Sequence, residues 1–200
     1  MSKVILPEPV FKGRVSVEEA IYNRISRRSF KAGRLNLAQV GQLLWAAGGL
    51  GVGGDAGVSR SAPSAGATYP VELYLVAGEV EELGPGCYYY DYREHRLKLM
   101  QKGDLRAQLA EASLGQQMVA RAPMSMIMSA CYERTSRRYG DRGYRYVFME
   151  IGYLSQNVYL QAEALNLSTV AVGAFDDERV KQILAIKEAP LMIMPVGHRR

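Results

Sequence analysis

The sequence predicts an α+β fold in which helices pack on a mostly antiparallel central sheet. The longest helical pattern, residues 144–167, is apolar or small on most of its sides, as expected for a central helix or one shared with a partner subunit. Short β-rich segments precede and follow it. Helices and strands do not alternate strictly, which argues against a parallel α/β fold.

Helix start signals divide the first third of the chain. The capping box that begins at Ser16 predicts a helix to about Arg24, and a similar signal at Asn36 predicts a helix that stops at Gly48 and Gly49. Residues 25–34 between these helices read as a basic loop. Residues 51–68 form a long loop rich in glycine, serine and alanine. A loop of that length in a compact domain is usually functional or disordered, and residues 51–61 could close as a lid.

The remaining elements follow from alternation, apolar runs and turn residues. One or two helices are expected over residues 104–120 with a break near 113–115, and another over 177–184, capped by Asp176. The basic segment 132–143 leads into the central helix. The apolar run 123–131 is typical of a strand in the middle of a sheet. The expected strands are 71–77, 87–92, 97–101, 123–131, 168–172 and 190–196.

Composition limits the class of protein. The 200 residues suit a single domain, residues 1–200, and the net charge of +5 is only mildly basic. The sequence contains no apolar run of about 20 residues and no signal-peptide pattern, so we expect a cytoplasmic protein without a membrane span. Cys87 and Cys131 are isolated, as expected for thiols in a reducing compartment. With only His95 and His198, we expect no metal site.

Arginines form the first candidate binding site. Arg27, Arg28 and Ser29 follow the first helix, and guanidinium groups form charge-assisted paired bonds with phosphate oxygens. Arg199 and Arg200 end the last expected strand and could reach the same phosphate. The alternatives are a solvated basic loop and a frayed terminus.

Two loops of small residues are the other candidates. The segment that begins at Pro63 and Ser64 lets a ligand approach the backbone closely, and Gly66 permits unusual backbone angles. Gly173 and Ala174 expose backbone N–H groups before a helix, where an electron-rich atom is favoured. An ordinary surface loop and an ordinary capped turn are the alternatives. Because no nucleophile–base pair is evident, these segments suit a cofactor that performs the chemistry itself.

Taken together, these motifs resemble the nitroreductase superfamily of FMN-dependent oxidoreductases, and in particular its SagB/ThcOx-type dehydrogenase branch. The matching segments run in order along most of the chain. They are RISRRSF (24–30), APSAGATYPVELYLV (62–76), the hairpin that carries Tyr88, Tyr89, Tyr90 and Tyr92 with its following GDLR (103–106), RYGDRGYRYVFMEIGYLSQNVYLQA (138–162), VGAFDDERVKQIL (172–184) and PLMIMPVGHR (190–199).

The resemblance implies a sandwich that dimerises through the long helix, with one FMN per subunit in two clefts at the interface. By matching position, Arg27, Arg28 and Ser29 hold the FMN phosphate and ribityl chain, helped by Arg199 or Arg200. NADH or NADPH is the implied electron donor, and the implied partner is a second copy of the chain, with neither nucleic acid nor membrane.

The resemblance also implies contacts with the flavin ring. Gly173 and Ala174 match the turn whose backbone N–H faces flavin N5, and Gln156 and Asn157 match the helix motif at the dimer seam. Arg60 is a further candidate beside the ring-lining loop. The residues that match that loop are Pro63, Ser64, Ala65 and Gly66.

The sequence departs from the family pattern at two points. Classical nitroreductases carry Glu-Gly at the N5 turn, whereas this chain has Gly173-Ala174, which keeps the backbone donor and loses the side chain. Azoline-oxidising members of the SagB branch use a Lys-Tyr pair, and this sequence contains no Lys-Tyr dipeptide. Thiazole or oxazole formation is therefore not the expected reaction.

The sequence thus predicts an FMN-dependent oxidoreductase that passes hydride through flavin N5, in a ping-pong cycle, from NAD(P)H or another donor to a small-molecule acceptor. In one alternative the protein binds FMN but does not catalyse this reaction. It would then be a redox-silent FMN-binding or sequestering protein, or an enzyme that uses FMN as its substrate. Another alternative is a nucleic-acid or anionic-surface binding module, suggested by the arginine clusters and the net charge of +5.

Overall fold

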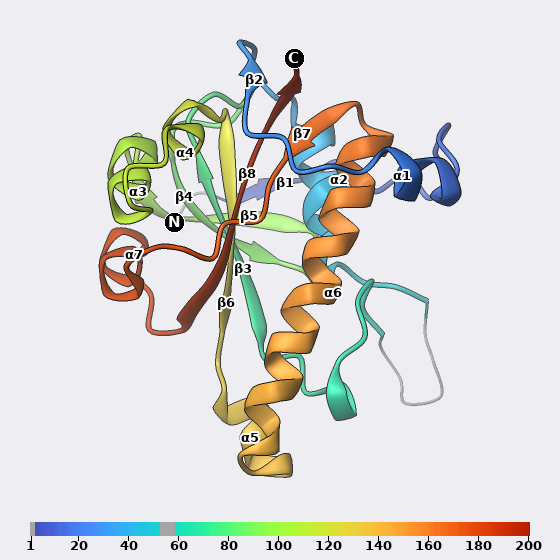
Figure 1. The fold of residues 1–200 in the computed structure, drawn as a ribbon, viewed down its shortest axis with the longest axis vertical. Coiled ribbons are helices and arrows are strands. Elements are labelled where there is room, and N and C mark those ends of the chain that lie inside the picture. The colour runs from blue at the N-terminus through green and yellow to red at the C-terminus, as the bar shows by residue number, and fades with distance from the viewer. Residues whose placement is uncertain (1–2, 53–58) are drawn as a thin grey trace.

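The computed structural model describes residues 3–52 and 59–200 of the chain, so part of the loop considered as a lid lies outside the described residues. Within these ranges the strands form an eight-stranded sheet in the order β1-β5-β4-β3-β6-β8-β2, with β7 also paired to β8 (Figure 1). The ladders between these strands are antiparallel, as predicted. The strands are β1 Lys3–Ile5, β2 Phe30–Lys31, β3 Val71–Ala77, β4 Gly86–Asp91, β5 Arg96–Lys102, β6 Met124–Ala130, β7 Leu167–Thr169 and β8 Ala189–Arg199.

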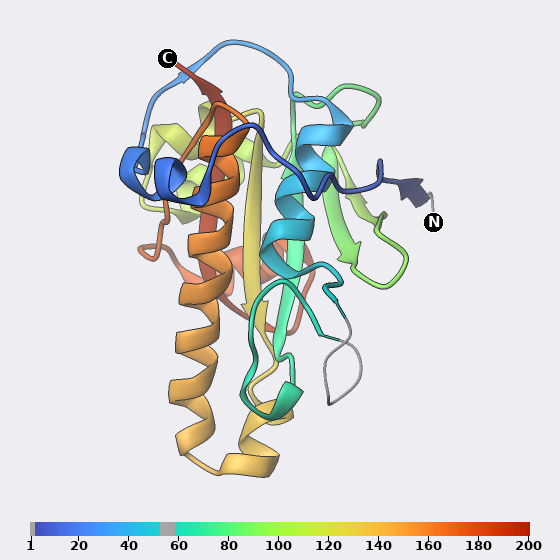
Figure 2. The same ribbon diagram turned by 90° about the vertical axis from the view of Figure 1, so that its right-hand side faces the viewer.

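Helices cover both faces of the sheet, so the predicted α+β class is confirmed (Figures 1 and 2). Helices α2 and α6 pack on one face, where they share a hydrophobic core with the sheet, and α3, α4 and α7 form a second core on the other. The helices are α1 Val17–Asn23, α2 Leu37–Gly48, α3 Arg106–Ala112, α4 Gln117–Arg121, α5 Glu133–Tyr139, α6 Arg142–Ala164 and α7 Asp177–Leu184, with a short 3₁₀ turn η1 at Ala65–Ala67.

Strands β3 and β6 form the centre of the sheet. Every residue of both strands is buried, because helices cover each face, and the two strands pair from Val71 opposite Ala130 to Ala77 opposite Met124. This arrangement explains why β6 carries no charged residue and is apolar except for Ser125 and Ser129, rather than alternating. The prediction of a mid-sheet strand over 123–131 is confirmed.

The predicted caps fix three helix starts. The Ser16 hydroxyl accepts a hydrogen bond from the Glu19 backbone N–H, and Asp176 caps α7 in the same way. Asn36 and Gln39 form a complete capping box at the start of α2. The break expected near residues 113–115 separates α3 from α4.

The central helix differs from its prediction at both ends. It begins at Arg142 and ends at Ala164 instead of covering 144–167, because Asn166 adopts a left-handed conformation with φ of 55° and the chain then enters β7. The basic segment before it contains an additional helix, α5. Gly140, with φ of 56°, separates the two helices.

The last strand is longer than predicted. It continues beyond Val196 to Arg199, because β2 and β7 pair with this extension, with Phe30 opposite Arg199 and Leu167 opposite His198. Residues 25–34 are therefore not entirely a loop, since β2 lies within them. These pairings bring residues 30–31 to the end of the chain, near the C-terminal end of α6 (Figure 1).

At Gly197, the pairing of β8 with β2 leaves no room for a side chain. This close contact leads to a stability prediction. A Cβ at Gly197 would lie 2.8 Å from Cγ and 2.9 Å from Cβ of Phe30. We expect Gly197→Ala to lower the free energy of unfolding by about 1–3 kcal/mol in urea titrations, because β2 must shift. Gly84→Ala is the control, since its nearest atom would be the Tyr88 hydroxyl at 3.8 Å. Equal effects of the two substitutions would contradict the packing described.

Candidate functional site

A buried carboxylate, that of Glu163, joins two arginines that are far apart in the sequence. Glu163 lies in the last turn of α6, and its side chain is only 5% exposed. One carboxylate oxygen pairs with the guanidinium of Arg27 and the other with that of Arg199. Arg27 comes from the segment after α1 and Arg199 from the end of β8. Three separate elements therefore meet at one carboxylate.

Tyr159, one turn earlier on α6, connects the Arg27 segment to the chain after β7. Its hydroxyl accepts a hydrogen bond from the Ala171 backbone N–H at 2.7 Å and lies 2.9 Å from the Ser26 hydroxyl. The Arg27 backbone N–H donates to the Thr169 carbonyl at 3.0 Å. These bonds hold residues 169–171 beside the segment that carries Arg27.

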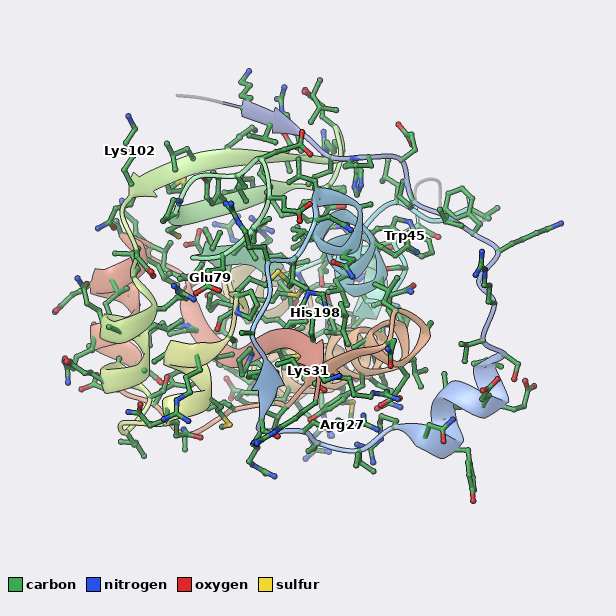
Figure 3. The ribbon with its side chains drawn as sticks, turned by 90° about the horizontal axis from the view of Figure 1, so that it is seen from above. Arg27, Lys31, Trp45, Glu79, Lys102 and His198 are labelled. Carbon is green, nitrogen blue, oxygen red and sulfur yellow. The ribbon has the colours of Figure 1, made fainter. Side chains whose placement is uncertain are left out.

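The surroundings of Glu163 retain positive charge. Arg28, Ser29 and Arg200 are exposed, and Arg28 forms no ion pair within the described residues. The Arg199 Nε is buried and has no hydrogen-bond partner there. Figure 3, seen from above, shows Arg27 on the side of the molecule where Lys31 of β2 pairs with His198 of β8. Since arginines outnumber the single carboxylate, this region favours an anion, and we call it the arginine cluster.

The turn before α7 presents free backbone donors. Gly173 and Ala174 are exposed, and within the described residues their backbone N–H groups make no hydrogen bond. Gln116 donates to the Ala174 carbonyl at 3.1 Å, which fixes the turn from the side. A Cβ at Gly173 would meet no atom within 4 Å, so the turn faces open space.

The loop of small residues has a strained backbone. Gly66, Ala67 and Tyr69 have φ values of 58°, 53° and 43°, in the left-handed region that non-glycine residues avoid. The Ser64 hydroxyl oxygen accepts a hydrogen bond from the Tyr69 backbone N–H at 2.9 Å, which closes the loop on itself. Such strain persists only where surrounding structure holds it, and it is frequent at functional sites.

Helix α5 supplies that support. Arg138 donates to the Gly66 carbonyl at 3.2 Å, and Arg134 donates to the Tyr69 carbonyl at 3.0 Å. Arg134 also pairs with the buried carboxylate of Glu72 on β3. The basic segment before α6 therefore holds the loop in place, a role that its sequence did not indicate.

Glu150 lies beneath the same loop, and it is 4% exposed. Burial raises the pKa of its carboxyl to about 7, although a hydrogen bond from Ser64 and the charge of Arg60 oppose that rise. The Arg60 guanidinium carbon lies 3.4 Å from the centroid of the Tyr92 ring and 4.7 Å from that of Tyr69. Arg60 is thus held between two aromatic rings near the loop.

A cavity of about 340 Å³ opens between this loop and the first half of α6. Its walls combine small loop residues with aromatic and polar side chains of the helix. The lining residues are Pro63, Ser64, Ala65, Tyr146, Met149, Glu150 and Tyr153.

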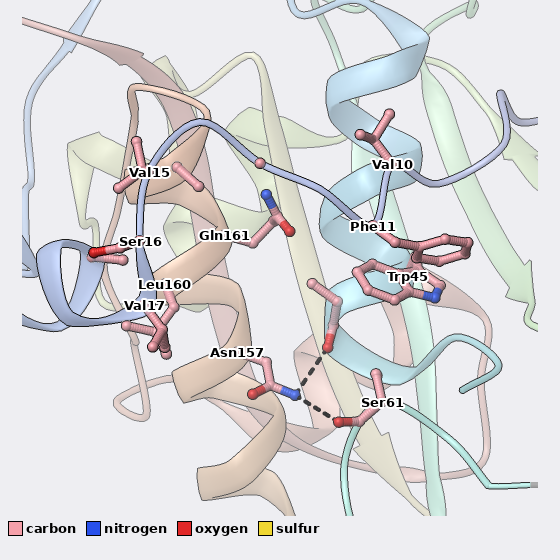
Figure 4. A pocket seen from close by; sticks show the side chains of 14 residues that line it. Val10, Phe11, Val15, Ser16, Val17, Trp45, Ser61, Asn157, Leu160 and Gln161 are labelled. Carbon is pink, nitrogen blue, oxygen red and sulfur yellow. Dashed lines mark hydrogen bonds between the residues drawn. The ribbon is translucent and has the colours of Figure 1, made fainter. Parts of the chain in front are cut away.

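A larger cavity, of about 500 Å³, lies between the N-terminal segment, α2 and α6 (Figure 4). Asn157 lies on its wall and donates to the Ala46 and Ser61 carbonyls, both at 3.1 Å. Its amide thus connects the end of α2 to the chain just before Pro63. This polar side chain of the central helix thus bonds nearby backbone.

One face of α6 is largely exposed. Gly152 and Gln156 are exposed in the middle of the helix, and a Cβ at Gly152 would meet no atom within 4 Å. Large apolar side chains on the N-terminal half of the helix are about half exposed. They are Tyr144 at 46%, Phe148 at 56%, Met149 at 46% and Tyr153 at 47%.

The predicted site residues form two groups at different levels of α6. The arginine cluster lies at the level of Glu163, whereas Pro63, Ser64 and Ala65 line a cavity with Glu150, and Arg60 lies near that carboxyl. The Gly173–Ala174 turn follows Val172, which pairs with Ile193 on β8. Glu163 follows Glu150 by 13 residues on one helix, which corresponds to about 20 Å along its axis. Figure 2 shows η1 near the start of α6 and the C-terminus near its end.

Comparison with known proteins assigns the fold to a family. The Nitroreductase family model matches residues 21–198. The chain belongs to the nitroreductase family. A nitroreductase homologue of Methanocaldococcus jannaschii is 43% identical over 185 residues, which are 92% of each chain. The crystal structure of a nitroreductase homologue from Ralstonia eutropha matches with a TM-score of 0.85 and 25% identity, covering 99% of this chain and 90% of that one.

The SagB-type resemblance is also confirmed. The microcin B17-processing protein McbC of Escherichia coli is 26% identical over 148 residues, which are 70% of this chain and 54% of McbC. The matched region therefore covers about half of McbC. Nitroreductases are typically FMN-dependent oxidoreductases, and membership of this family makes the chain an oxidoreductase.

In the described part of the chain, none of the helices is long and apolar enough to cross a membrane.

Sequence reasoning missed Glu163 as the residue that joins Arg27 to Arg199. The available signal was a glutamate on a helix otherwise apolar or small on most sides, in a chain with clustered arginines. The role of α5 was also missed, because hydrogen bonds to loop carbonyls leave no pattern in the sequence.

Glu163 yields a stability prediction. We expect Glu163→Gln to lower the free energy of unfolding by about 3 kcal/mol, because two partly buried guanidinium groups lose their counter-charge. Denaturant titration measures this change. Glu178→Gln, which removes a surface pair with Lys181, should cost less than about 0.5 kcal/mol. A Glu163→Gln variant as stable as this control would show that the arginines do not depend on Glu163.

Glu150 yields a pH prediction. Its pKa in the folded chain lies above the ordinary value of 4.5, so its contribution to stability is complete below pH 4.5 and is lost as the pH rises through about 7. We expect the wild type to lose up to about 3 kcal/mol relative to Glu150→Gln between pH 4.5 and pH 8. Urea titrations of both proteins across this range measure the difference. A pH-independent difference would mean that the carboxyl does not titrate there.

Proposed function

We propose that this nitroreductase is an FMN-dependent oxidoreductase that works as a homodimer, with each flavin site built from both protomers. The observation that carries the proposal is the placement of the two groups of predicted site residues about 20 Å apart along α6, with an exposed helix face between them.

The arginine cluster fits the phosphate of FMN. Glu163 orients Arg27 and Arg199, and Arg28 and Ser29 stand exposed beside them as additional donors. The buried Arg199 Nε, which has no partner among the described residues, is a donor that an anion can satisfy. In this proposal these residues hold the phosphate and the ribityl chain.

The two loops fit a flat ring. The exposed N–H groups of Gly173 and Ala174 are suited to an electron-rich ring atom, which we take to be N5. The small residues Pro63 to Gly66 allow close approach of a ring, and the bonds from α5 keep the loop rigid. When bound, FMN supplies hydride acceptance and donation, here between NADH or NADPH and a small-molecule acceptor. The chain itself binds the cofactor, aims backbone donors at it and excludes water.

A two-fold symmetric pairing of α6 helices joins the two groups. Gly152 and Gln156 lie on the exposed face of α6, between Glu150 and Glu163 in the sequence. An antiparallel partner helix that crosses α6 there would complete the two flavin sites of the dimer. Each arginine cluster then lies near the partner's loop of residues 63–66. Burial of Phe148, Met149 and Tyr153 would favour this pairing.

The acceptor is a small molecule of a class still to be assigned. McbC processes microcin B17, by its name, but this chain lacks the Lys-Tyr pair of azoline-oxidising SagB-type enzymes. We therefore do not propose peptide azoline formation.

The phosphate assignment predicts loss of flavin on removal of the arginines. We expect Arg27→Ala combined with Arg28→Ala to purify with less than about a tenth of the wild-type FMN, because charge-assisted bonds to phosphate are lost. Absorbance near the flavin bands, with identification of the chromophore released by heat, measures it. Arg121→Ala on α4 is the control. A double variant with full FMN would overturn the assignment, and a wild type that binds no FMN would overturn the proposed function.

The proposed dimer interface predicts that a larger side chain at position 152 weakens the dimer, because this position faces only the partner subunit. We expect Gly152→Arg to shift the protein from dimer to monomer in analytical ultracentrifugation, because the partner helix approaches closely there. Gln108→Arg on exposed α3 should leave the dimer intact. A Gly152→Arg dimer of unchanged affinity would place the seam elsewhere.

A further inference from the structure

Glu150 combines burial with access to a cavity. It is 4% exposed, yet it is one of the residues that line the 340 Å³ cavity between α6 and residues 63–65 of the loop. Within the described residues it forms no ion pair, whereas the other buried glutamates, Glu72 and Glu163, pair with arginines. A buried carboxyl without a counter-ion at a cavity wall is more typical of function than of structural support.

The groups that face Glu150 come from two elements. On the loop, Ser64 accepts from the Tyr69 backbone N–H, so its hydroxyl proton is free to donate to Glu150. Arg60 acts as a more distant positive charge that favours the ionised form. From α6 itself, the cavity wall adds the phenol side chains of Tyr146 and Tyr153.

These opposing effects leave the carboxyl able to gain or lose a proton near neutral pH. Burial, the largest effect, raises the pKa to about 7, and the Ser64 hydrogen bond and the Arg60 charge limit the rise. A proton donor or acceptor works best when its pKa lies near the working pH. Ser64 accommodates both states, because its hydroxyl can donate to a carboxylate and accept from a carboxylic acid.

We infer that Glu150 exchanges a proton with the substrate of the proposed oxidoreductase, at the cavity beneath the loop of residues 63–66. The inference rests on the proposed function, which supplies the hydride. In substrate reduction, a hydride equivalent from the reduced cofactor adds to one atom of a polarised double bond such as N=O, C=N or C=O. The π electrons move to the other atom, the Glu150 O–H bond breaks, and its proton is transferred there. The carboxylate then regains a proton from water, and substrate oxidation runs these transfers in reverse.

A purely structural role makes a different prediction. The loop is already held by Arg134, Arg138 and the Ser64–Tyr69 bond, and Asn157 anchors the chain before it. Replacing Glu150 by glutamine keeps a hydrogen-bond acceptor for Ser64 but removes the exchangeable acid. The loop should therefore stay in place in Glu150→Gln while proton transfer is lost.

The test compares wild type, Glu150→Gln and Glu150→Asp, with Glu81→Gln at an exposed turn as the control. Nitrosobenzene is the probe, because its N=O bond takes one hydride and one proton. Stopped-flow mixing of the pre-reduced enzyme with nitrosobenzene gives the rate across pH 5–9. FMN content and dimer mass are measured on every variant. Carbon-13 NMR of the glutamate carboxyls gives the Glu150 titration directly, with Glu150→Gln for assignment.

We expect the wild-type rate to be level at low pH and to fall about tenfold per pH unit above pH 7, since the acid form is the donor. Glu150→Gln should keep its FMN and dimer mass, react about 100-fold more slowly and lose this pH dependence. Glu150→Asp should recover a titrating profile, and Glu81→Gln should match wild type. The NMR titration should show a midpoint near pH 7.

Two results would overturn the inference while leaving the proposed function intact. One is a Glu150→Gln variant that retains FMN with the rate and pH profile of wild type. The other is an NMR midpoint near 4.5, the ordinary carboxyl value. Glu150→Asp serves to assign the signal if Glu150→Gln does not fold. Failure of the wild type to bind FMN would instead refute the proposed function, and the inference would fail with it.

Discussion

The shared carboxylate of Glu163 is the interaction on which the arrangement of the candidate site depends. It fixes Arg27, from the first part of the chain, against Arg199, at the end of β8, and it does so from the last turn of α6. Two guanidinium groups would otherwise repel each other. With Glu163 buried between them, they are ordered and still leave positive charge nearby on Arg28 and Arg200. The cluster is thus preorganised for an anion instead of being solvated as two separate loops.

Helix α6 then sets the distance between this cluster and the second group of residues. The loop of residues 63–66, whose strained continuation includes Ala67 and Tyr69, is held by α5 and lies near Glu150, about 20 Å before Glu163 along the helix. Since α6 is rigid and its outward face is apolar, a symmetric partner accounts for both the distance and the exposed side chains. The proposed dimer therefore follows from the spacing within one protomer and from the uncovered face together.

Much of this arrangement could be predicted from the sequence, and the exceptions have physical causes. Caps at Ser16, Asn36 and Asp176 are local interactions, so sequence patterns report them. The short strand β2 and the extension of β8 were not predicted, because β2 exists only through pairing with β8, and the extension forms where β2 and β7 pair with it. The ion pairs of Glu163 and the raised pKa of Glu150 depend on burial between distant segments. No local pattern encodes such contacts.

The measurement that tests the shared flavin site most directly is complementation between two inactive variants. Protomers with Arg27→Ala and Arg28→Ala are mixed with protomers that carry Ser64→Trp and Gly66→Trp, and mixed dimers are isolated by two affinity tags. If each site combines one protomer's arginines with its partner's loop, a mixed dimer contains one intact site and should bind one FMN per dimer. Each parent dimer should bind none. Mixed dimers that form but bind no FMN would contradict the account and place both groups of residues in a site within one protomer.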